Sequence, residues 1–211
     1  MALFETTILV TYTLAAIVLV LTPGPGQALV MAYTISGGRK HGVLAALGLE
    51  VGTLTHTLAA SLGLSAILAT SAIAFVAVKF VGAFYLIFLG IRFLLAKKPV
   101  AEAAKREAKS DWRVFAQAIA TGVLNPKVAL FFLAFLPQFV RPERGAVVLQ
   151  FLILGSILAL FGFIGDSLVA LTTGYFGDWL DRNPSFQQWR QRVTGMLLIG
   201  IGARLALVHR N

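Results

Sequence analysis

The stretch "VLTPGPGQALV", residues 20–30, lies inside an apolar run that is long enough to cross a bilayer, yet it contains Pro23, Gly24, Pro25 and Gly26. Proline inside a helix removes a backbone donor and clashes with the preceding turn, which costs about 3 kcal/mol or more. Hydrocarbon supplies no water to satisfy the freed carbonyl groups. The first membrane helix is therefore expected to be broken at this stretch.

The composition indicates an all-α polytopic membrane protein. The chain of 211 residues is 58% hydrophobic and 13% charged, with a mean hydropathy of +0.83, whereas globular domains are about 25% charged. It has no cysteine, which excludes disulfides, thiol redox chemistry and thiolate metal sites. Its first residues, "MALFE", lack the basic region of a signal peptide, so this end is expected to be retained in the first span.

Six apolar runs are predicted to be transmembrane helices: 6–33, 43–69, 73–95, 114–139, 146–173 and 193–209. The last run is short and contains Arg204, so a five-span arrangement remains an alternative. The net charge of +9 comes mostly from loops on one predicted side, which include Arg39, Lys40, Lys97, Lys98, Lys105, Arg106, Lys109, Arg113, Arg182, Arg190 and Arg192. The other side, with both termini, holds Arg141, Arg144 and Arg210. The positive-inside rule places the first set in the cytoplasm and both termini in the periplasm, and it explains the charge without nucleic acid.

A second break is predicted in "TGVLNPKVALFF", residues 121–132, where Asn125-Pro126 interrupts the fourth run. Pro23 and Pro126 are 103 residues apart, about half the chain, and each broken run begins a group of three. Such groups enter the membrane in opposite directions, as in inverted-repeat transporters, whose substrate site lies at paired discontinuous helices. We predict a first repeat at 1–95, a cytoplasmic connector at 96–113 and a second repeat at 114–211.

Each break is also predicted to begin a new half-helix. Thr22 and Asn125 both precede a proline, as N-cap residues do before a proline at the first helical position. The free N–H groups and the positive dipole end would then attract an anionic group such as a carboxylate. The alternative is that both breaks are packing kinks.

Of nine acidic residues, Glu50 and Asp166 fall well inside apolar runs, at depths that we expect to match. A charged residue deep in a span marks an ion or substrate pathway by default. The alternative is a structural ion pair with Lys127. Thr53 and Thr57 share the helix face of Glu50. His56 is interpreted as a packing residue, and the Gly48/Gly52 pattern beside Glu50 is expected to hold that carboxylate in a helix interface.

The sequence contains no enzyme, cofactor or metal motif. It lacks a supported Ser-His-Asp arrangement and the patterns HExxH, GxGxxG and P-loop. Because a P-loop is needed to use ATP by that route, transport would be driven by an ion gradient.

Over nearly its whole length the chain resembles the LysE/RhtB family of bacterial amino-acid exporters. The resemblance lies in "TPGPGQALV", "GLEVGTLTHTLAASLGL", "KFVGAFYLIFLGIRFL" and "TGVLNPKVALFFLAFLPQFV". It implies a small multi-pass secondary transporter of the inner membrane that exports amino acids or close derivatives by proton antiport. Related thiol-redox carriers are excluded by the absence of cysteine.

We predict one substrate site, in which the substrate carboxylate binds at the two helix breaks. The substrate ammonium faces Glu50 or Asp166, and one of these carboxylates also carries the driving proton. The predicted substrate-binding residues are Thr22, Pro23, Gly24, Pro25, Gln27, Asn125, Pro126 and Lys127. The expected partners are an amino acid, protons and membrane lipids, and a homo-oligomer is left open. The rival interpretations are a divalent-cation exporter, in which Lys127 would repel the metal, a membrane-embedded enzyme and a structural subunit.

Overall fold

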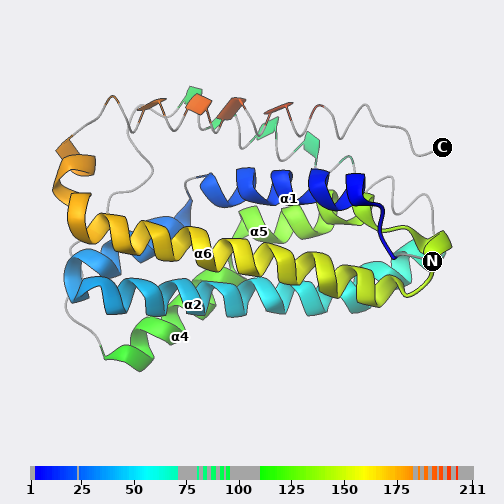
Figure 1. Ribbon diagram of the computed structural model, residues 1–211, viewed down its shortest axis with the longest axis horizontal. Coiled ribbons are helices and arrows are strands. Elements are labelled where there is room, and N and C mark those ends of the chain that lie inside the picture. Colours follow the sequence, from blue (N-terminus) through cyan, green and yellow to red (C-terminus); the bar gives the residue numbers. More distant parts are fainter. Residues whose placement is uncertain are drawn as a thin grey trace.

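The computed structural model describes residues 3–22, 24–70 and 110–182, with scattered residues between 80 and 95 and between 185 and 203. Every regular element in this part of the chain is helical, as predicted (Figure 1). The elements are α1 (Thr6–Leu21), α2 (Pro25–Thr70), α4 (Asp111–Val123), α5 (Pro126–Leu130), the π-helix η1 (Phe131–Phe135), the 3₁₀ helices η2 (Leu136–Phe139) and η3 (Pro142–Arg144), and α6 (Val147–Arg182).

The predicted break in the first span is confirmed, because α1 ends at Leu21 and α2 begins at Pro25. The prediction that Thr22 caps the second half-helix is wrong. Its hydroxyl donates 2.8 Å back to the carbonyl of Val18, so that Thr22 ends α1 instead of beginning α2. Pro25 takes the first position of α2, where its missing N–H costs nothing, and Pro23 lies outside the described residues.

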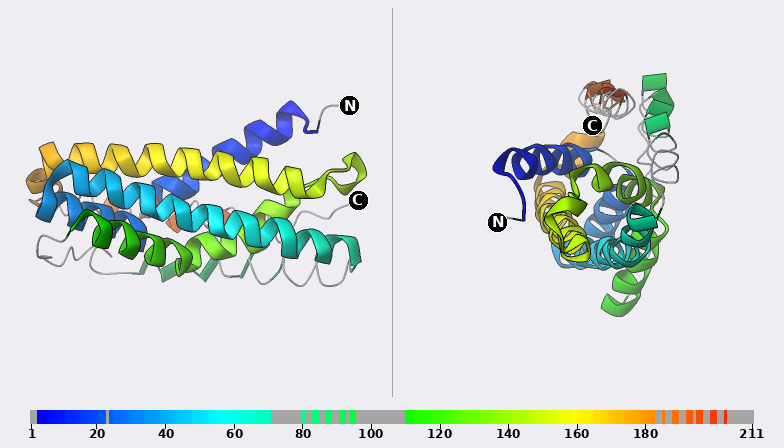
Figure 2. Two further views of the ribbon diagram at one scale, coloured as in Figure 1. Left: turned by 90° about the horizontal axis from the view of Figure 1, so that it is seen from below. Right: turned by 90° about the vertical axis from the view of Figure 1, so that its right-hand side faces the viewer.

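A second irregularity divides α2 at Gly38, whose φ of 77° favours glycine because other residues pay a Cβ clash there. Residues 25–37 continue in the direction of α1, and the residues after Gly38 run back along the bundle (Figures 1 and 2). The loop expected between the runs 6–33 and 43–69 is therefore a one-residue kink within helical backbone.

The predicted break in the fourth span is also confirmed. Helix α4 ends at Val123 and α5 begins at Pro126. The side chain of Asn125 accepts a hydrogen bond of 3.1 Å from the backbone N–H of Lys127, which is the predicted N-cap. Helices α1 and α4 run in opposite directions (Figure 1). Most of the runs 73–95 and 193–209 lies outside the described residues, so the six-helix inverted repeat and its domain bounds stay predictions.

Within the described part of the chain, three helical stretches are long and apolar enough to cross a membrane: Pro25–Gly63, Asp111–Phe139 and Val147–Thr173. Helix α1 is apolar but shorter. Helix α6 packs against both α1 and α2, and it continues to Arg182, beyond the predicted end at 173.

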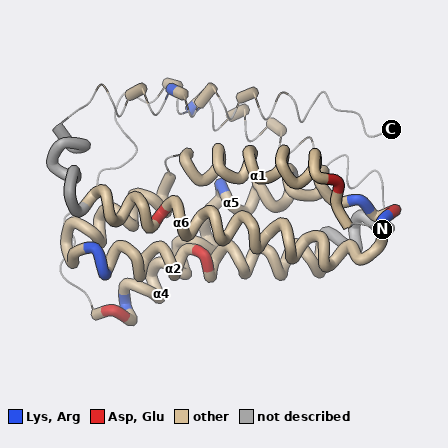
Figure 3. Tube along the Cα trace, in the orientation of Figure 1, with Lys and Arg blue, Asp and Glu red and all other residues tan. Residues whose placement is uncertain are grey.

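Charged residues gather at the two ends of the bundle, and a few lie between them on α2, α5 and α6 (Figure 3). At one end Asp111 pairs with Lys40 at 2.6 Å and contacts His41 at 3.0 Å. These contacts fasten the start of α4 to α2 just after its kink.

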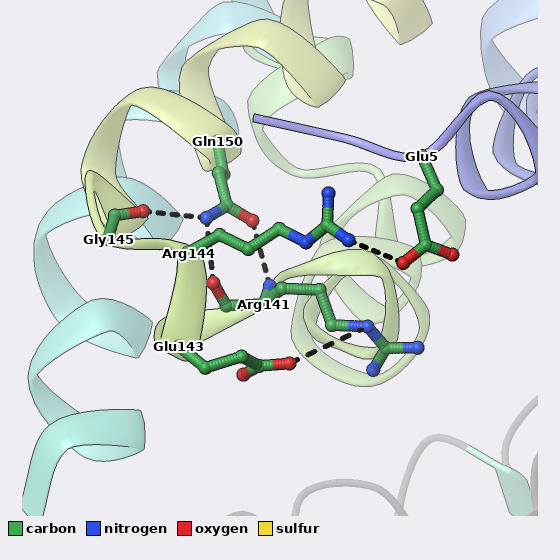
Figure 4. Close-up of polar contacts among 6 residues, drawn as sticks. All are labelled: Glu5, Arg141, Glu143, Arg144, Gly145 and Gln150. Carbon is green, nitrogen blue, oxygen red and sulfur yellow. Dashed lines mark hydrogen bonds and ion pairs between the residues drawn. The ribbon is translucent and has the colours of Figure 1, made fainter. Parts of the chain in front are cut away.

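At the opposite end, Gln150 holds the turn that leads into α6 (Figure 4). Its side chain is fully buried, accepts from the N–H of Arg141 at 2.8 Å, and donates to the carbonyls of Arg141 and Gly145. Beside it Arg144 pairs with Glu5, which fastens the same turn to the start of α1.

In the part of the chain that the structure describes, buried apolar side chains form two clusters within the bundle. One lies toward the end of the bundle that contains Gln150, and it joins α1, η1, η2 and α6, with Tyr12, Phe131 and Leu158 among its members. The other joins α2, α4 and α6 toward the Asp111 end, with Tyr33, Leu49 and Ala118 among its members. The polar site described next lies where these clusters meet.

Candidate functional site

The two helix breaks lie against each other, and Lys127 connects them. Its ammonium donates hydrogen bonds to the carbonyls of Thr22 at 2.9 Å and Leu19 at 3.1 Å. Carbonyls in the last turn of a helix have no partner within it, and that end carries a partial negative charge. Lys127, from the second break, therefore caps α1 at the first break.

Gln27 completes this cap from the other side of the first break. Its side-chain NH₂ group donates to the carbonyl of Val20 at 2.7 Å. Its carbonyl oxygen is buried and has no hydrogen-bond partner among the described residues. The residue itself is 6% exposed. One end of this amide is thus committed to α1, and the other end is not.

A cavity of about 50 Å³ lies between the two breaks. Its polar lining consists of Gln27, Glu50, Thr53, Asn125, Lys127 and Asp166. Its apolar lining consists of Leu19, Val20, Leu49, Val128 and Leu158, with glycines at 26, 122 and 162. A water needs about 10–15 Å³ of such volume, whereas ligand pockets measure about 300–1,000 Å³. In this conformation the cavity therefore has room for a few waters and is too small for a larger ligand.

The expected match in depth between Glu50 and Asp166 is confirmed, because both line this cavity, from α2 and α6 respectively. The Lys127 ammonium is close enough to act on both carboxylates through its charge. With both carboxylates ionised, the three groups carry a net charge of −1. One Glu50 oxygen, Oε2, is buried without a hydrogen-bond partner in the described part of the chain.

The position of Glu50 depends on a glycine in the facing helix. A Cβ placed on Gly162 of α6 would overlap the Glu50 carboxylate, so that this carboxylate lies directly on the α6 backbone. This contact is not predicted by the sequence. No signal in the sequence pairs positions 50 and 162.

Gly48 and Gly52 serve a different interface from the predicted one. A Cβ on Gly52 would lie 2.6 Å from the Cα of Gly122, so these glycines bring α2 close to α4. Glu50 is two residues from each of them and points about 200° away around the helix. The glycine pair therefore faces α4, whereas Glu50 faces α6.

Three of the eight predicted substrate-binding residues line the cavity, namely Gln27, Asn125 and Lys127. Thr22, Gly24, Pro25 and Pro126 are not among its lining residues, and Pro23 lies outside the described ones. Thr22, Gly24, Pro25 and Pro126 thus belong to the breaks and not to the cavity lining.

His56 is confirmed as a hydrogen-bonded packing residue. Its Nε2 lies 3.0 Å from the carbonyl of Val123 at the end of α4, and its ring stacks on Phe132 with centroids 6.0 Å apart. Thr53 lines the cavity with Glu50, whereas Thr57 packs against Gly155 of α6.

Comparison with known proteins adds an independent observation. Residues 17–209 match the family model described as LysE type translocator. An uncharacterized membrane protein of Bacillus subtilis (strain 168) is 34% identical, over 94% of this chain and 98% of its own. A leucine efflux protein of Enterobacter sp. (strain 638) is 30% identical, over 94% of this chain and 95% of its own. No solved structure matches the chain.

Proposed function

We propose that this chain, which belongs to the LysE type translocator family, exports a neutral aliphatic amino acid across the bacterial inner membrane in exchange for protons. The observation that carries the proposal is the composition of the cavity. One cation and two carboxylates lie beside a wall of aliphatic side chains, between two broken helices. An α-amino acid has the complementary set of groups: a carboxylate, an ammonium and a side chain.

In this proposal the substrate carboxylate binds Lys127 and the amide of Asn125, and its ammonium faces the acidic side of the cavity at Glu50 and Asp166. Leu19, Val20, Leu49, Val128 and Leu158 would then surround the substrate side chain. A second charged side chain would be costly to bury among them without a partner. This preference agrees with the leucine efflux relatives.

The charge of the cavity supports the proposal of antiport. A site of net charge −1 accommodates one further positive charge, which is either the substrate ammonium or a proton on one carboxylate. Hosting both in a poorly solvated space is unfavourable. Substrate and proton would therefore bind alternately, and each would travel in its own direction.

Alternating access would require the two apolar clusters to loosen in turn, because both contribute residues to the cavity lining. Lys127 would couple binding to this motion. A substrate carboxylate would compete with the carbonyls at the end of α1 for the Lys127 ammonium. Helix α1 contributes residues to the apolar cluster that contains Tyr12 and Phe131. Substrate binding would thus weaken the hydrogen bonds that hold α1 in this cluster, and the cluster could then open.

The membrane orientation belongs to the same proposal. We place both termini in the periplasm, with repeats at 1–95 and 114–211 around a cytoplasmic connector at 96–113. The Asp111 end of the bundle is then cytoplasmic and the Glu5 end periplasmic. A divalent-cation exporter is less well supported, because the Lys127 ammonium shares the cavity with both carboxylates.

Transport into inverted membrane vesicles tests this function, because export from the cell appears as uptake by the vesicle. Vesicles with and without the protein would be offered each amino acid, with the lumen acidified or at equal pH. We expect uptake of leucine, isoleucine or valine, stimulated by the acidic lumen. Absence of amino-acid uptake above control vesicles would refute the function, and uptake that ignores the pH difference would refute proton coupling.

A further inference from the structure

Gln27 lines the cavity, and its side chain carries a hydrogen-bond acceptor that no described residue satisfies. The carbonyl oxygen of Val20 can only accept a hydrogen bond, so the Gln27 group that faces it at 2.7 Å must be the NH₂ group. The amide oxygen Oε1 then points the other way. It is buried, and it has no partner among the described residues. Because an acceptor cannot bind a carboxylate, Gln27 does not belong with the carboxylate-binding residues.

A second acceptor without a partner lines the same cavity. Glu50 Oε2 is buried and receives no hydrogen bond from any described residue. The carboxylate has no room to move toward α6, because the backbone of Gly162 lies against it. Leaving buried acceptors without donors costs about 1–3 kcal/mol each, and more for a charged group. The pair therefore indicates a ligand that supplies hydrogen-bond donors.

The kink at Gly38 brings these two acceptors together. Gln27 and Glu50 both belong to α2, but Gln27 precedes the kink and Glu50 follows it. Since the second part of α2 runs back beside the first, both residues reach one cavity from a single element (Figures 1 and 2).

We propose that Gln27 Oε1 and the Glu50 carboxylate form the receptor for the substrate α-ammonium, which makes Gln27 a specificity-determining residue. An ammonium group offers three donors and a charge that Glu50 balances. The donors Lys127 and Asn125 are left for the substrate carboxylate, so the substrate has one orientation in the cavity. The inference rests on the proposed function and adds that the transporter selects amino acids over the corresponding hydroxy acids.

Gln27 also has a structural role, because it caps Val20, and substitutions separate the two roles. Gln27→Glu keeps an acceptor but loses the donor to Val20. Gln27→Met loses both and keeps a similar length. Gln117→Met is a matched control, because Gln117 lies on α4, accepts a hydrogen bond from Tyr33 of α2, and does not line the cavity.

The experiment measures binding of leucine, and of its hydroxy-acid analogue with a hydroxyl in place of the ammonium, to the purified full-length protein by calorimetry. We expect the wild type and Gln117→Met to bind leucine at least about tenfold more tightly than the analogue. Gln27→Met should weaken leucine binding by about tenfold and leave the analogue nearly unchanged. Gln27→Glu should keep the preference for leucine.

Parallel weakening of both ligands in Gln27→Met would show that Gln27 is a helix cap only, and it would overturn the assignment while the proposed function stands. If Gln27→Met did not fold, the wild type and Glu50→Gln would test the assignment. It fails if the wild type does not bind leucine more tightly than the hydroxy acid. It also fails if Glu50→Gln keeps the full preference for leucine. If the wild type bound none of leucine, isoleucine and valine, the proposed function itself would fail, and the assignment with it.

Discussion

The ammonium of Lys127 lies 2.9 Å from the carbonyl oxygen of Thr22, although 105 residues separate the two in sequence. Thr22 belongs to the break in the first span, and Lys127 belongs to the break in the fourth. This contact joins the two discontinuous helices at the cavity. It also makes one side chain responsible both for holding the end of α1 and for the positive charge of the site.

Replacing Lys127 by Met should therefore loosen α1 and impair transport together. Charge at a helix terminus contributes about 0.3–2 kcal/mol, so backbone amides around the last turn of α1 should exchange hydrogen faster. Transport by proteoliposomes should fall at least about tenfold, since a charged buried contact is lost. Lys40→Met is the control, because its 77% exposed side chain makes a surface pair with little effect. Wild-type transport by Lys127→Met would contradict the coupling role.

Gly162→Ala should impair transport without unfolding the protein. The added methyl group would meet the end of the Glu50 side chain, which can move aside but then leaves its place in the cavity. Gly63→Ala is the control, because nothing lies within 4 Å of that position. Gly52→Ala should instead lower the amount of folded protein, because backbone of Gly122 lies 2.6 Å away and cannot yield. Equal transport by Gly162→Ala and Gly63→Ala would show that the position of Glu50 is unimportant.

Glu50→Gln should separate exchange from proton-driven transport. The amide cannot carry the proton, yet it keeps the shape of the side chain. We expect proteoliposomes with this variant to exchange labelled for unlabelled substrate at saturating concentration, although with weaker affinity because the ammonium receptor has lost its charge, and not to accumulate substrate when a pH difference is imposed. Asp166→Asn should weaken substrate binding or folding without removing the response to the pH difference. Accumulation that persists in Glu50→Gln would leave Asp166 as the proton carrier.

Gln150→Leu should destabilise the turn that leads into α6. Leucine leaves backbone groups of Arg141 and Gly145 in this part-buried turn without their partner, at a cost of about 2 kcal/mol. The Tm in detergent should fall by about 4–8 °C. Thr55→Val, which removes an exposed hydroxyl bonded within its own helix, should leave Tm nearly unchanged. An unaltered Tm in Gln150→Leu would mean that water replaces these hydrogen bonds.

The orientation in the membrane is open to a labelling test, because the natural chain contains no cysteine. Single cysteines at Lys105 and Ser185 should resist an impermeant thiol reagent added to intact cells, and one at Arg144 should react. Labelling at Lys105 from outside would reverse the charge-based topology.

Much of this arrangement could be predicted from the sequence, because its causes are local. Proline cannot continue a helix in hydrocarbon, which placed the breaks near residues 23 and 126. An asparagine before a proline is a typical N-cap, which identified the start of α5 at Asn125. The high cost of burying charge singled out Glu50 and Asp166, and counting residues along the helices matched their depth.

Local sequence patterns did not predict the contacts of a residue that had two possible partners. Thr22 could cap the next helix or bond back to the preceding turn, and it does the latter, since α2 begins at Pro25 and not at Pro23. Glu50 could share the interface of Gly48 and Gly52, but the rotation of α2 about its axis turns the glycines toward α4 and the carboxylate toward α6.

A membrane protein with two broken helices and two carboxylates at matched depth is readable from the amino-acid sequence, because these properties depend on each segment and its solvent. The packing of the helices is needed to see that Lys127 caps α1, that Gln27 turns its amide oxygen away from Val20, and that Glu50 lies on Gly162. These contacts join residues far apart in the chain. They depend on the kink at Gly38 and on the rotation of each helix in the bundle, which neighbouring residues do not specify.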